Sequence, residues 1–552
     1  MSTVDQPRRT GEGGAAEIQP AGVASVEPAQ STQSTQSAPA KRSGGSRRFV
    51  LATASATCAL IVLDTNVVAV SLPSIARSFH AGFADVEWVV SSYMVAFASC
   101  LLPMGAMADR YGRKKMMILG LLVFALASLG CGLAPSVSVL NTARAIKGVG
   151  ASMLLTAALA VIANTFPDAR DRTRAWAIWG TTMGMATTVA PLVGGVITQW
   201  IGWRWIFLLN LPVCAVLAAC ALRSIAESRN PDAGPVDVLG SVLFGTGLAV
   251  GIWALIGTQN EGWHSLPTVL RFTGCAAALV CFVKTEKRRP HAMVDLSLFS
   301  QPRFVAAVLS MFGYAACAQV MMTFLPLYLQ NAFEWSAVWA GAGMLPFALA
   351  MICGPFVGTR LGRHQSSESV LTVGLALVGA GNLLTALVAA HRQYEWVAFG
   401  MIVTGFGAGI LNGETQKAIM ARVPVHRTGM ASGISTTTRF TAIVTSVGVL
   451  GAVLSWRTQS VMDQHLNAAM GLGKQVDRAF MSNLLAGDIV HATSRVAPDA
   501  RAALENMASA SFAGGFAAAL AFAGGLALIV GCLVQILSGR GRGVDGRENS
   551  RT

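Results

Sequence analysis

Long apolar stretches alternate with short polar segments over most of the chain. A membrane-spanning helix needs about 20 mostly apolar residues, because each helical residue adds only about 1.5 Å of length. About fourteen stretches meet that requirement: 51–75, 88–108, 115–133, 139–164, 176–198, 205–223, 236–257, 267–284, 303–329, 335–359, 369–390, 395–419, 428–455 and 511–538. The pattern therefore predicts an all-α polytopic membrane protein.

The spans divide into groups. Residues 1–48, rich in Ser, Gln, Ala, Gly and Pro, have the composition of a disordered tail rather than of a signal peptide. The predicted parts are this cytoplasmic tail, a six-helix bundle at 49–225, a linker hairpin of two extra helices at 226–290, a second six-helix bundle at 291–538, and a short cytoplasmic tail at 539–552. The extra pair carries little polar chemistry, so we expect it to be peripheral. The polar outer segment 456–510 predicts partly helical caps and shows no catalytic constellation.

Composition and charge support this division. Of the 552 residues, 53% are hydrophobic and 12% charged, whereas a soluble domain carries about 25% charged residues. The formal net charge of +14 comes from Lys and Arg clustered in short loops, so it indicates membrane topology rather than nucleic-acid binding. The ten cysteines lie in apolar stretches without metal-ligand spacing, and we predict no metal site.

The distribution of loop charges predicts orientation. Lys and Arg gather in alternate loops, whereas the short loops near 79–87, 134–138 and 330–334 hold none. The exceptions in the other outer loops are Arg204, Arg271 and Arg392. Short loops rich in Lys and Arg stay in the cytoplasm. Both termini are therefore expected in the cytoplasm, with the outer segment on the opposite side of the membrane.

The loop at 105–115 carries the most specific pattern in the chain. Its characteristic residues are Gly105, Asp109, Arg110, Gly112 and Arg113. Glycine allows the close helix approach and the turn that such a loop needs. An ordinary basic inner loop with no further role would also explain the charges.

This loop resembles the signature between spans two and three of the major facilitator superfamily. The stretch 354–364 is similar to a degraded copy of it, at the place where a second half would put one. Internal duplication is typical of transporters built from two bundles that rock against each other. The resemblance implies the major facilitator fold, with two six-helix bundles plus two extra central helices.

Two ionisable residues are predicted at similar membrane depth. Asp64 lies 16 residues after Arg48, which places it near mid-membrane, and Arg144 enters from the outside on span four. Intramembrane charges are costly and often functional, and a buried carboxyl could exchange a proton. The pair could hold one another until a proton or substrate breaks the contact. A static ion pair, or a simple hydrogen bond from Asp64 to a neighbouring helix, remains the alternative.

Two further ionisable residues lie in the second half. Arg439, midway along span thirteen, could meet an anionic substrate group, balance a carboxylate or stabilise helix packing. Glu414 lies three residues before Lys417 near the inner end of span twelve, and an i,i+3 surface pair explains it best. None of the eight histidines falls inside a span, which disfavours a histidine proton relay.

Span five is rich in small residues. It contains Gly184, Pro191, Gly194 and Gly195. Small residues allow close packing and proline bends a helix, so this span could repack between two states. Packing alone would also explain the glycines.

Four stretches resemble the signatures of the fourteen-span drug:proton antiporters of EmrB/QacA type. They are residues 63–73 in span one, 144–151 in span four, 190–195 in span five, and 203–207 followed by Asn210 and Pro212 at the start of span six. The chain departs from the family pattern with Ala190 for the usual Gly, Lys147 for Gln, and Phe440 and Ala442 for Gln and Gly.

The resemblance implies a proton-coupled exporter of small amphipathic compounds in the bacterial inner membrane. Asp64 would take a proton from outside with Arg144 modulating its proton affinity, and Asp109, Arg110 and Arg113 would hold the inner side closed in the outward-facing state. The proton gradient would supply the energy without a cofactor, since no Walker-type loop is present. The sequence shows no nucleophile–base or metal-binding motif that would indicate an enzyme.

Two alternatives remain at this stage. Proton-coupled uptake of a small solute on the same fold is one, and the span-five signature argues against it. A non-transporting membrane sensor or a channel is the other, but the spans are too apolar for a channel and no signalling domain is evident. The sequence leaves open the substrate and a periplasmic adaptor partner.

Overall fold

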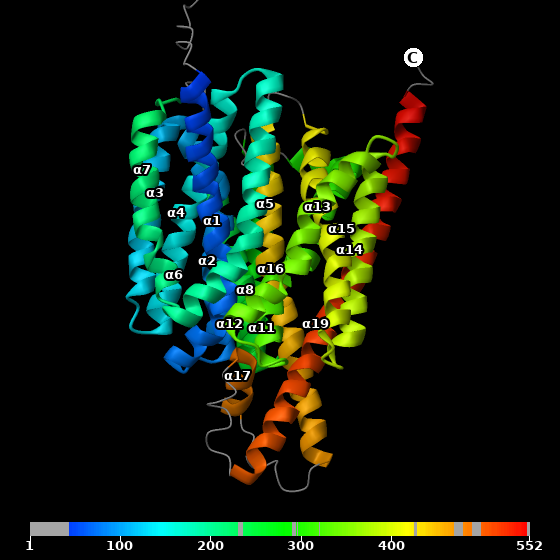
Figure 1. Ribbon diagram of the computed structural model, residues 1–552. Helices are drawn as coiled ribbons and strands as arrows, with labels where there is room; N and C mark the ends of the chain where they lie inside the picture. Colours follow the sequence, from blue (N-terminus) through cyan, green and yellow to red (C-terminus); the bar gives the residue numbers. More distant parts are fainter. Residues whose placement is uncertain are drawn as a thin grey trace, which may run out of the picture. The chain divides into compact units, whose positions relative to one another are not determined.

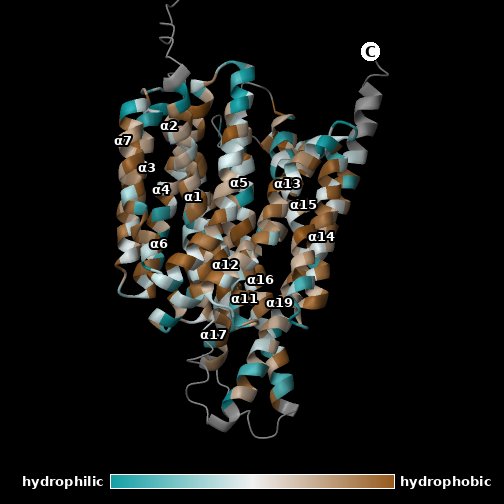
Figure 2. Cartoon of the chain, in the orientation of Figure 1, coloured by the Kyte–Doolittle hydropathy of each residue, from teal (hydrophilic) through white to brown (hydrophobic). Residues whose placement is uncertain are grey.

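The computed structural model describes residues 44–229, 236–289, 294, 296–319, 321–423, 428–468, 478–487 and 498–548. All regular structure within these ranges is helical, which confirms the all-α prediction. Fourteen of the described helices, counted with their short breaks, are long and apolar enough to cross a membrane, as predicted. Figure 2 shows apolar residues over the middle of the helices and polar residues toward their ends.

The first half of the chain supplies six spans and the extra pair. Five spans are single helices and the sixth is broken after one turn: α1 (Gly44–Phe79), α2 (Phe83–Tyr111), α3 (Arg113–Gly132), α4 (Val137–Thr165), α5 (Ala169–Trp200), and α6 (Trp205–Leu208) with α7 (Asn210–Ser224). The extra pair is α8 (Val238–Glu261) and α9 (Leu266–Arg288).

The second half supplies six more spans, two of them interrupted. A short 3₁₀ helix at Leu296–Ser300 leads into the ninth span, in which a π-helical segment (Ala315–Gln319) joins α10 (Pro302–Tyr314) to α11 (Met321–Asn331). The remaining spans are α12 (Ala337–Gly343) with α13 (Leu345–Leu361), α14 (Ser367–Ala389), α15 (Tyr394–Met420), α16 (Thr428–Ala468) and α19 (Pro498–Glu548). The start of α1 and the end of α19 lie at the same end of the molecule (Figure 1).

Several helices run past their predicted ends. α1 begins at Gly44, inside the predicted tail 1–48, and α19 continues to Glu548, inside the predicted tail 539–552. Residues 1–43 lie outside the described residues. α2 begins at Phe83, so Glu87, expected in an outer loop, is part of a helix and is buried. Polar residues continue a helix as readily as apolar ones, and the length rule for a span does not count them.

The extra pair is peripheral only in part. α9 packs mainly on α8 and leaves most of its surface open. α8 packs against both α2 and α16, and its Leu255 is buried where a side chain at Gly448 of α16 would meet it. The expectation of a peripheral pair is therefore wrong for α8, which lies between the two bundles.

The outer segment forms a small core of its own. The extensions of α16 and α19 pack with α17 (Arg478–Ala486) around buried apolar side chains, namely Met462, Leu466, Phe480, Met481, Leu484, Leu504 and Ala508. Ser482 Oγ of α17 accepts a hydrogen bond from the Phe83 amide at the start of α2, at 3.2 Å. The described part of this segment is helical, as expected.

Candidate functional site

A buried charge cluster lies where α1, α4 and α7 meet. Asp64 Oδ2 accepts a hydrogen bond from Arg144 Nη1 at 3.0 Å. Asp64 Oδ1 accepts one from Lys147 Nζ at 2.5 Å and one from Asn210 Nδ2 at 3.0 Å. Arg144 also donates through Nε to the Val89 carbonyl at 2.9 Å. We call Asp64, Arg144, Lys147 and Asn210 the Asp64 cluster; with every group ionised it carries one net positive charge.

Helix geometry explains why both cations point to Asp64. Residues three apart on a helix share a face, so α4 presents Arg144 and Lys147 together. A Cβ on Gly148 would lie 2.4 Å from the Tyr93 carbonyl oxygen of α2, and one on Gly150 would lie 2.9 Å from a backbone nitrogen of α3. These two glycines let α4 approach α2 and α3 closely on different faces, which turns the cationic face into the bundle.

Aromatic rings complete the surroundings of the cations. The Arg144 guanidinium lies 4.3 Å from the Tyr93 ring centroid. Lys147 Nζ lies 4.6 Å from the Phe124 centroid and 4.9 Å from that of Phe207. The side chains of Asp64, Arg144 and Lys147 are at most 1% exposed, so the charges depend on each other and on these rings rather than on water.

The structure brings together two residues that the sequence singled out and adds two. Asp64 and Arg144 form the contact that their similar depth suggested. Lys147 was noted only as a departure from the family pattern and Asn210 only as a matching position, and both bond directly to the carboxylate. The available signal for Lys147 was its spacing of three residues from Arg144 on the same helix.

The loop between α2 and α3 is held by a residue that the sequence analysis missed. Gly112 adopts φ = +118°, a conformation that favours glycine. The Glu227 carboxylate accepts hydrogen bonds from the amides of Lys114 and Lys115, both at 3.1 Å, and so caps the start of α3. Arg113 pairs with Asp109 at 2.9 Å.

The other residues of this loop signature lie nearby. Gly105 faces α4, where a Cβ added to it would lie 3.6 Å from Thr156 Cγ2, in ordinary van der Waals contact. The exposed Arg110 lies 5.8 Å from the Tyr111 ring centroid. These contacts join the signature to helices of the first bundle. Its function in holding the inner side closed stays a prediction.

The small residues of α5 face the second bundle at one end of the helix. A Cβ on Gly195 would lie 2.4 Å from the Ala337 carbonyl oxygen of α12. A Cβ on Gly341 of α12 would lie 2.4 Å from the Pro191 carbonyl oxygen. Backbone therefore packs directly on backbone here, and we call this contact the α5–α12 seam.

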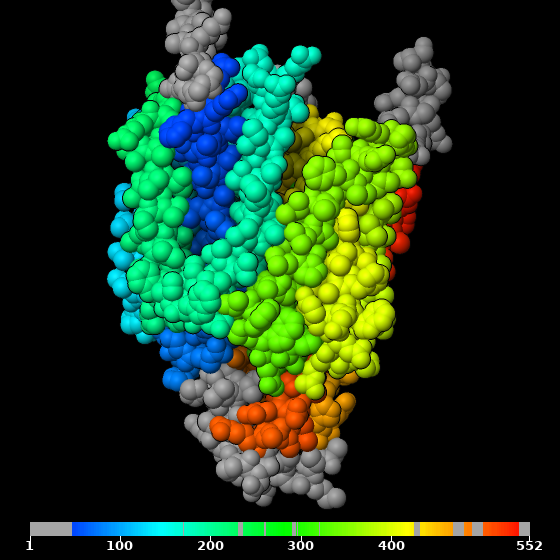
Figure 3. All heavy atoms as spheres, in the orientation of Figure 1, coloured from blue at the N-terminus to red at the C-terminus, as the bar shows by residue number. Residues whose placement is uncertain are grey.

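The same face of α5 opens toward its other end. Gly194 packs on Val67 of α1, but a Cβ on Gly184 would find its nearest neighbour, Ile352 of α13, only at 3.8 Å. A Cβ on Gly180, one turn earlier, would have no neighbour within 4 Å. Figure 3 shows the surface hollowed between α5 and α13 at the end where α1 begins. Along α5 the two bundles are therefore in contact at the end predicted to be outer and apart beside Gly180, at the end predicted to be cytoplasmic.

The predicted ionisable residues of the second bundle lie in separate surroundings. Arg439 donates through Nε to Gln319 Oε1 at 2.7 Å and lies 5.7 Å from the Tyr314 ring centroid. Gln319 ends the π-helical segment, a feature often found at functional sites. Glu414 pairs with Lys417 at 3.2 Å, with its own side chain 9% exposed and that of Lys417 65% exposed.

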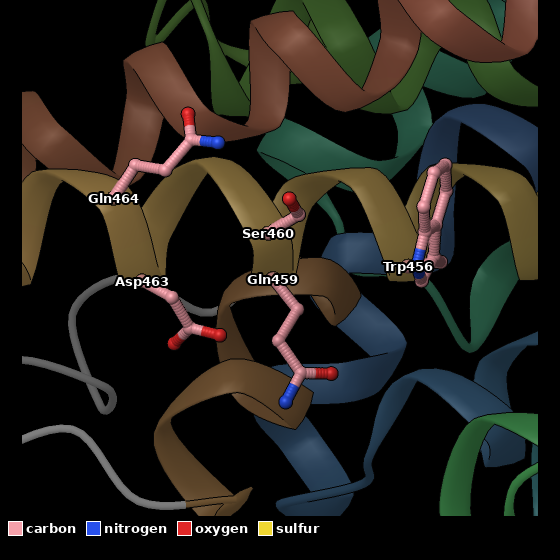
Figure 4. Close-up of a pocket in the computed structure, with 5 residues that line it drawn as sticks. All are labelled: Trp456, Gln459, Ser460, Asp463 and Gln464. Atoms are coloured by element: carbon pink, nitrogen blue, oxygen red, sulfur yellow. The ribbon is translucent and has the colours of Figure 1, made fainter.

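A pocket lies beyond the predicted span 428–455, on the extension of α16 (Figure 4). Trp456, Gln459, Ser460, Asp463 and Gln464 line it, and their spacing of three and four residues places them along one side of a single helix. A pocket lined by one side of a single helix encloses a ligand poorly, whereas binding sites are usually concave and largely apolar. We therefore expect the substrate path to lie between the bundles.

Comparison with known proteins finds a family model and relatives that agree with each other. Residues 54–447 match the family model described as Major Facilitator Superfamily. Multidrug resistance protein Stp of Mycobacterium tuberculosis is 33% identical over 412 residues, covering 74% of this chain and 76% of that protein. The methylenomycin A resistance protein of Streptomyces coelicolor is 31% identical over 397 residues, covering 72% and 83%.

Solved structures of low sequence identity share the fold. A bacterial homologue of the human lysosomal transporter Spinster, in an inward-facing and unoccupied conformation, superposes with a TM-score of 0.60 at 16% identity. The match covers 90% of this chain and 99% of that one. A peptide transporter in complex with sulfate gives a TM-score of 0.58 at 14% identity, covering 89% and 94%.

Proposed function

Because the chain belongs to the Major Facilitator Superfamily, a family of membrane transporters rather than of enzymes, we propose that it exports small amphipathic compounds across the bacterial inner membrane in exchange for protons. Export of drugs, antibiotics or related metabolites is supported by the relatives, which are named as multidrug or methylenomycin A resistance proteins. The Lys and Arg of the predicted inner loops support an orientation with both termini in the cytoplasm.

The single observation that carries the coupling is the Asp64 cluster. Ionisable side chains at membrane depth are expensive, and a cluster that buries an anion between two cations is a strong candidate for a proton site. Protonation changes the net charge of the cluster by one unit. A change of charge in a buried site can favour one arrangement of the surrounding helices over another.

Transport would proceed by alternating access between the bundles. The hollow beside Gly180 admits substrate from the cytoplasm, while the α5–α12 seam closes the outer side. Opening the outer side requires the seam to separate, and the loop signature at Asp109, Arg110 and Arg113 then holds the inner side closed. The energy suffices, since one charge crossing 100 mV releases about 2.3 kcal/mol, enough for a gradient of roughly fifty-fold.

Energised everted membrane vesicles test this function with amphipathic fluorescent compounds and a pH probe. The wild-type protein should accumulate at least one compound inside the vesicles and release protons to the outside when that compound is added. Asp64→Asn should abolish both signals, because the cluster loses its anion. Glu261→Gln is the matched control, since Glu261 pairs with Arg271 at the outer end of α8. Full proton-driven accumulation in Asp64→Asn would overturn the coupling proposal, and movement in the reverse direction would indicate uptake.

A further inference from the structure

Among the residues that the structure describes, the groups that bond to the Asp64 carboxylate are hydrogen-bond donors. Arg144 and Lys147 have no acceptor in their charged forms. Asn210 could offer its oxygen if its amide were turned over, but its Nδ2 also lies 3.3 Å from the Ile206 carbonyl, which fixes the nitrogen on that side. A proton on Asp64 would therefore have no acceptor among these partners and would displace an existing donor.

Lys147 can lose a proton without losing its bond to Asp64. A neutral amine retains two N–H groups, so Nζ can still donate to Oδ1 across the same contact. Nζ also lies over the Phe124 and Phe207 rings, which require no hydrogen-bond donor. Arg144 cannot be deprotonated in proteins, so Lys147 is the only cation of the cluster that can titrate.

The charge count favours the same residue. With Asp64 and Arg144 ionised, the cluster is neutral when Lys147 is an amine and carries +1 when Lys147 is an ammonium. Protonating Asp64 beside two cations would raise the charge to +2, with the three ionisable side chains at most 1% exposed. A buried site avoids uncompensated charge, so it alternates between 0 and +1 rather than between +1 and +2.

The other titratable groups around the cluster leave this count unchanged. They are Tyr93 on α2, Cys131 on α3 and Cys214 on α7, all of which are buried. In their protonated forms they carry no formal charge. From α1 and α4, the elements that provide the ion pairs, the charged groups facing Lys147 are Asp64 and Arg144.

We propose that the exchangeable proton of this transporter sits on Lys147 and that Asp64 stays ionised through the cycle. The Lys147 ammonium gives one proton to water reached from the cytoplasmic side and becomes an amine, and the amine takes one proton from water reached from the outer side. Only an N–H bond breaks and forms, and no electrons are exchanged. The assignment rests on the proposed proton coupling and places it on a residue where the related antiporters usually carry a glutamine.

Infrared difference spectroscopy between alkaline and acidic pH tests the assignment on the purified full-length protein in lipid nanodiscs. The carbonyl band of a protonated carboxyl group reports carboxyl protonation, ¹³C labelling of aspartate separates aspartate from glutamate, and loss of the band in an Asp64→Asn variant assigns it to Asp64. In the wild type we expect no Asp64 band over the whole of this pH range. In Lys147→Gln the carboxylate faces one cation instead of two, so a band should appear on acidification and vanish in Lys147→Gln/Asp64→Asn.

Two spectroscopic outcomes would overturn the assignment. A wild-type carboxyl band that is lost in Asp64→Asn would place the proton on Asp64. The absence of any such band in Lys147→Gln would show that Lys147 is not what keeps Asp64 ionised. The spectra need no substrate and no transport, so they remain decisive if the vesicle assay fails and the proposed function is wrong.

Lys147→Arg provides a second test through transport. Arginine retains the positive charge and the donor but cannot give up its proton, so substrate-induced proton release should fall to background. Retained binding of a fluorescent substrate and an unchanged unfolding temperature show that the variant is folded. If the larger side chain prevents folding, Lys147→Gln and the spectra decide alone. Proton release equal to wild type from folded Lys147→Arg would contradict the proposal.

Discussion

Asp64 is the anion that balances Arg144 and Lys147, and all three side chains are buried. Asp64→Asn leaves both cations buried without a carboxylate, and breaking a buried ion pair in this way costs about 3–5 kcal/mol. Deprotonation of Lys147 can relieve part of that cost. We expect a clear fall in the unfolding temperature of the purified protein in detergent, measured by the fluorescence of its tryptophans.

The double variant Asp64→Asn/Lys147→Gln distinguishes the loss of charge balance from the loss of packing as the cause of lower stability. It removes one cation together with the anion, so it should recover part of the stability that Asp64→Asn loses. Residues in direct contact commonly show such non-additive effects. If the double variant is less stable than Asp64→Asn by the full cost of Lys147→Gln alone, charge balance is not what holds the cluster together.

The depth of a residue in the membrane could be predicted from the sequence. The rotation of its helix about the helix axis could not. Counting residues placed Asp64 and Arg144 at similar depth. The partners Lys147 and Asn210 depend on how α4 and α7 are turned, and for α4 that is fixed by the close contacts of Gly148 with Tyr93 and of Gly150 with α3. Those contacts join residues far apart in the sequence and leave no local pattern.

At the scale of helices, the apolar pattern identified every span but not every helix end. The apolar run of α16 was expected to end at 455, whereas the helix continues to Ala468 because the outer segment packs around its own core. Glu87 was expected in a loop because α2 begins at Phe83, before the apolar run at 88–108. The extra helix α8 looked featureless, yet it packs against both bundles. Partners of an evenly apolar helix cannot be read from its composition.

Glu227 shows how a single acidic residue can define an element's start. Its carboxylate accepts the Lys114 and Lys115 amides at the positive end of α3. Glu227→Ala should therefore lower stability by about 1 kcal/mol or less, as loss of an N-terminal cap does. The measurement is the unfolding temperature of the purified protein.

Gly112→Ala should lower the stability more than Glu227→Ala does. It strains a backbone at φ = +118° and places a Cβ 2.6 Å from Glu227 Oε1. Gly180→Ala is the control, since its Cβ meets nothing within 4 Å. An effect of Glu227→Ala no larger than that of the control would show that the carboxylate does not cap α3 in solution.

For the whole molecule, the two bundles are joined unevenly along α5. The α5–α12 seam closes one end through backbone contacts that a Cβ would disrupt, whereas the other end is open beside Gly180. A transporter that works by alternating access must close the end that is open and open the end that is closed. We therefore expect substrate to enter this state from the side of the predicted inner loops.

Cysteine labelling tests this state and the orientation of the protein together. In a background whose ten native cysteines are replaced, Gly180→Cys should react quickly with a membrane-impermeant maleimide added to everted vesicles, because the reagent reaches the hollow from the cytoplasmic side. Ala190→Cys, on the same helix and fully buried, should stay protected. Equal labelling of the two positions, or labelling of Gly180→Cys only in right-side-out vesicles, would contradict an opening toward the cytoplasm. Substrate that shifts the population toward the outward-facing state should slow the reaction at position 180, since the bundles must close there when the seam separates.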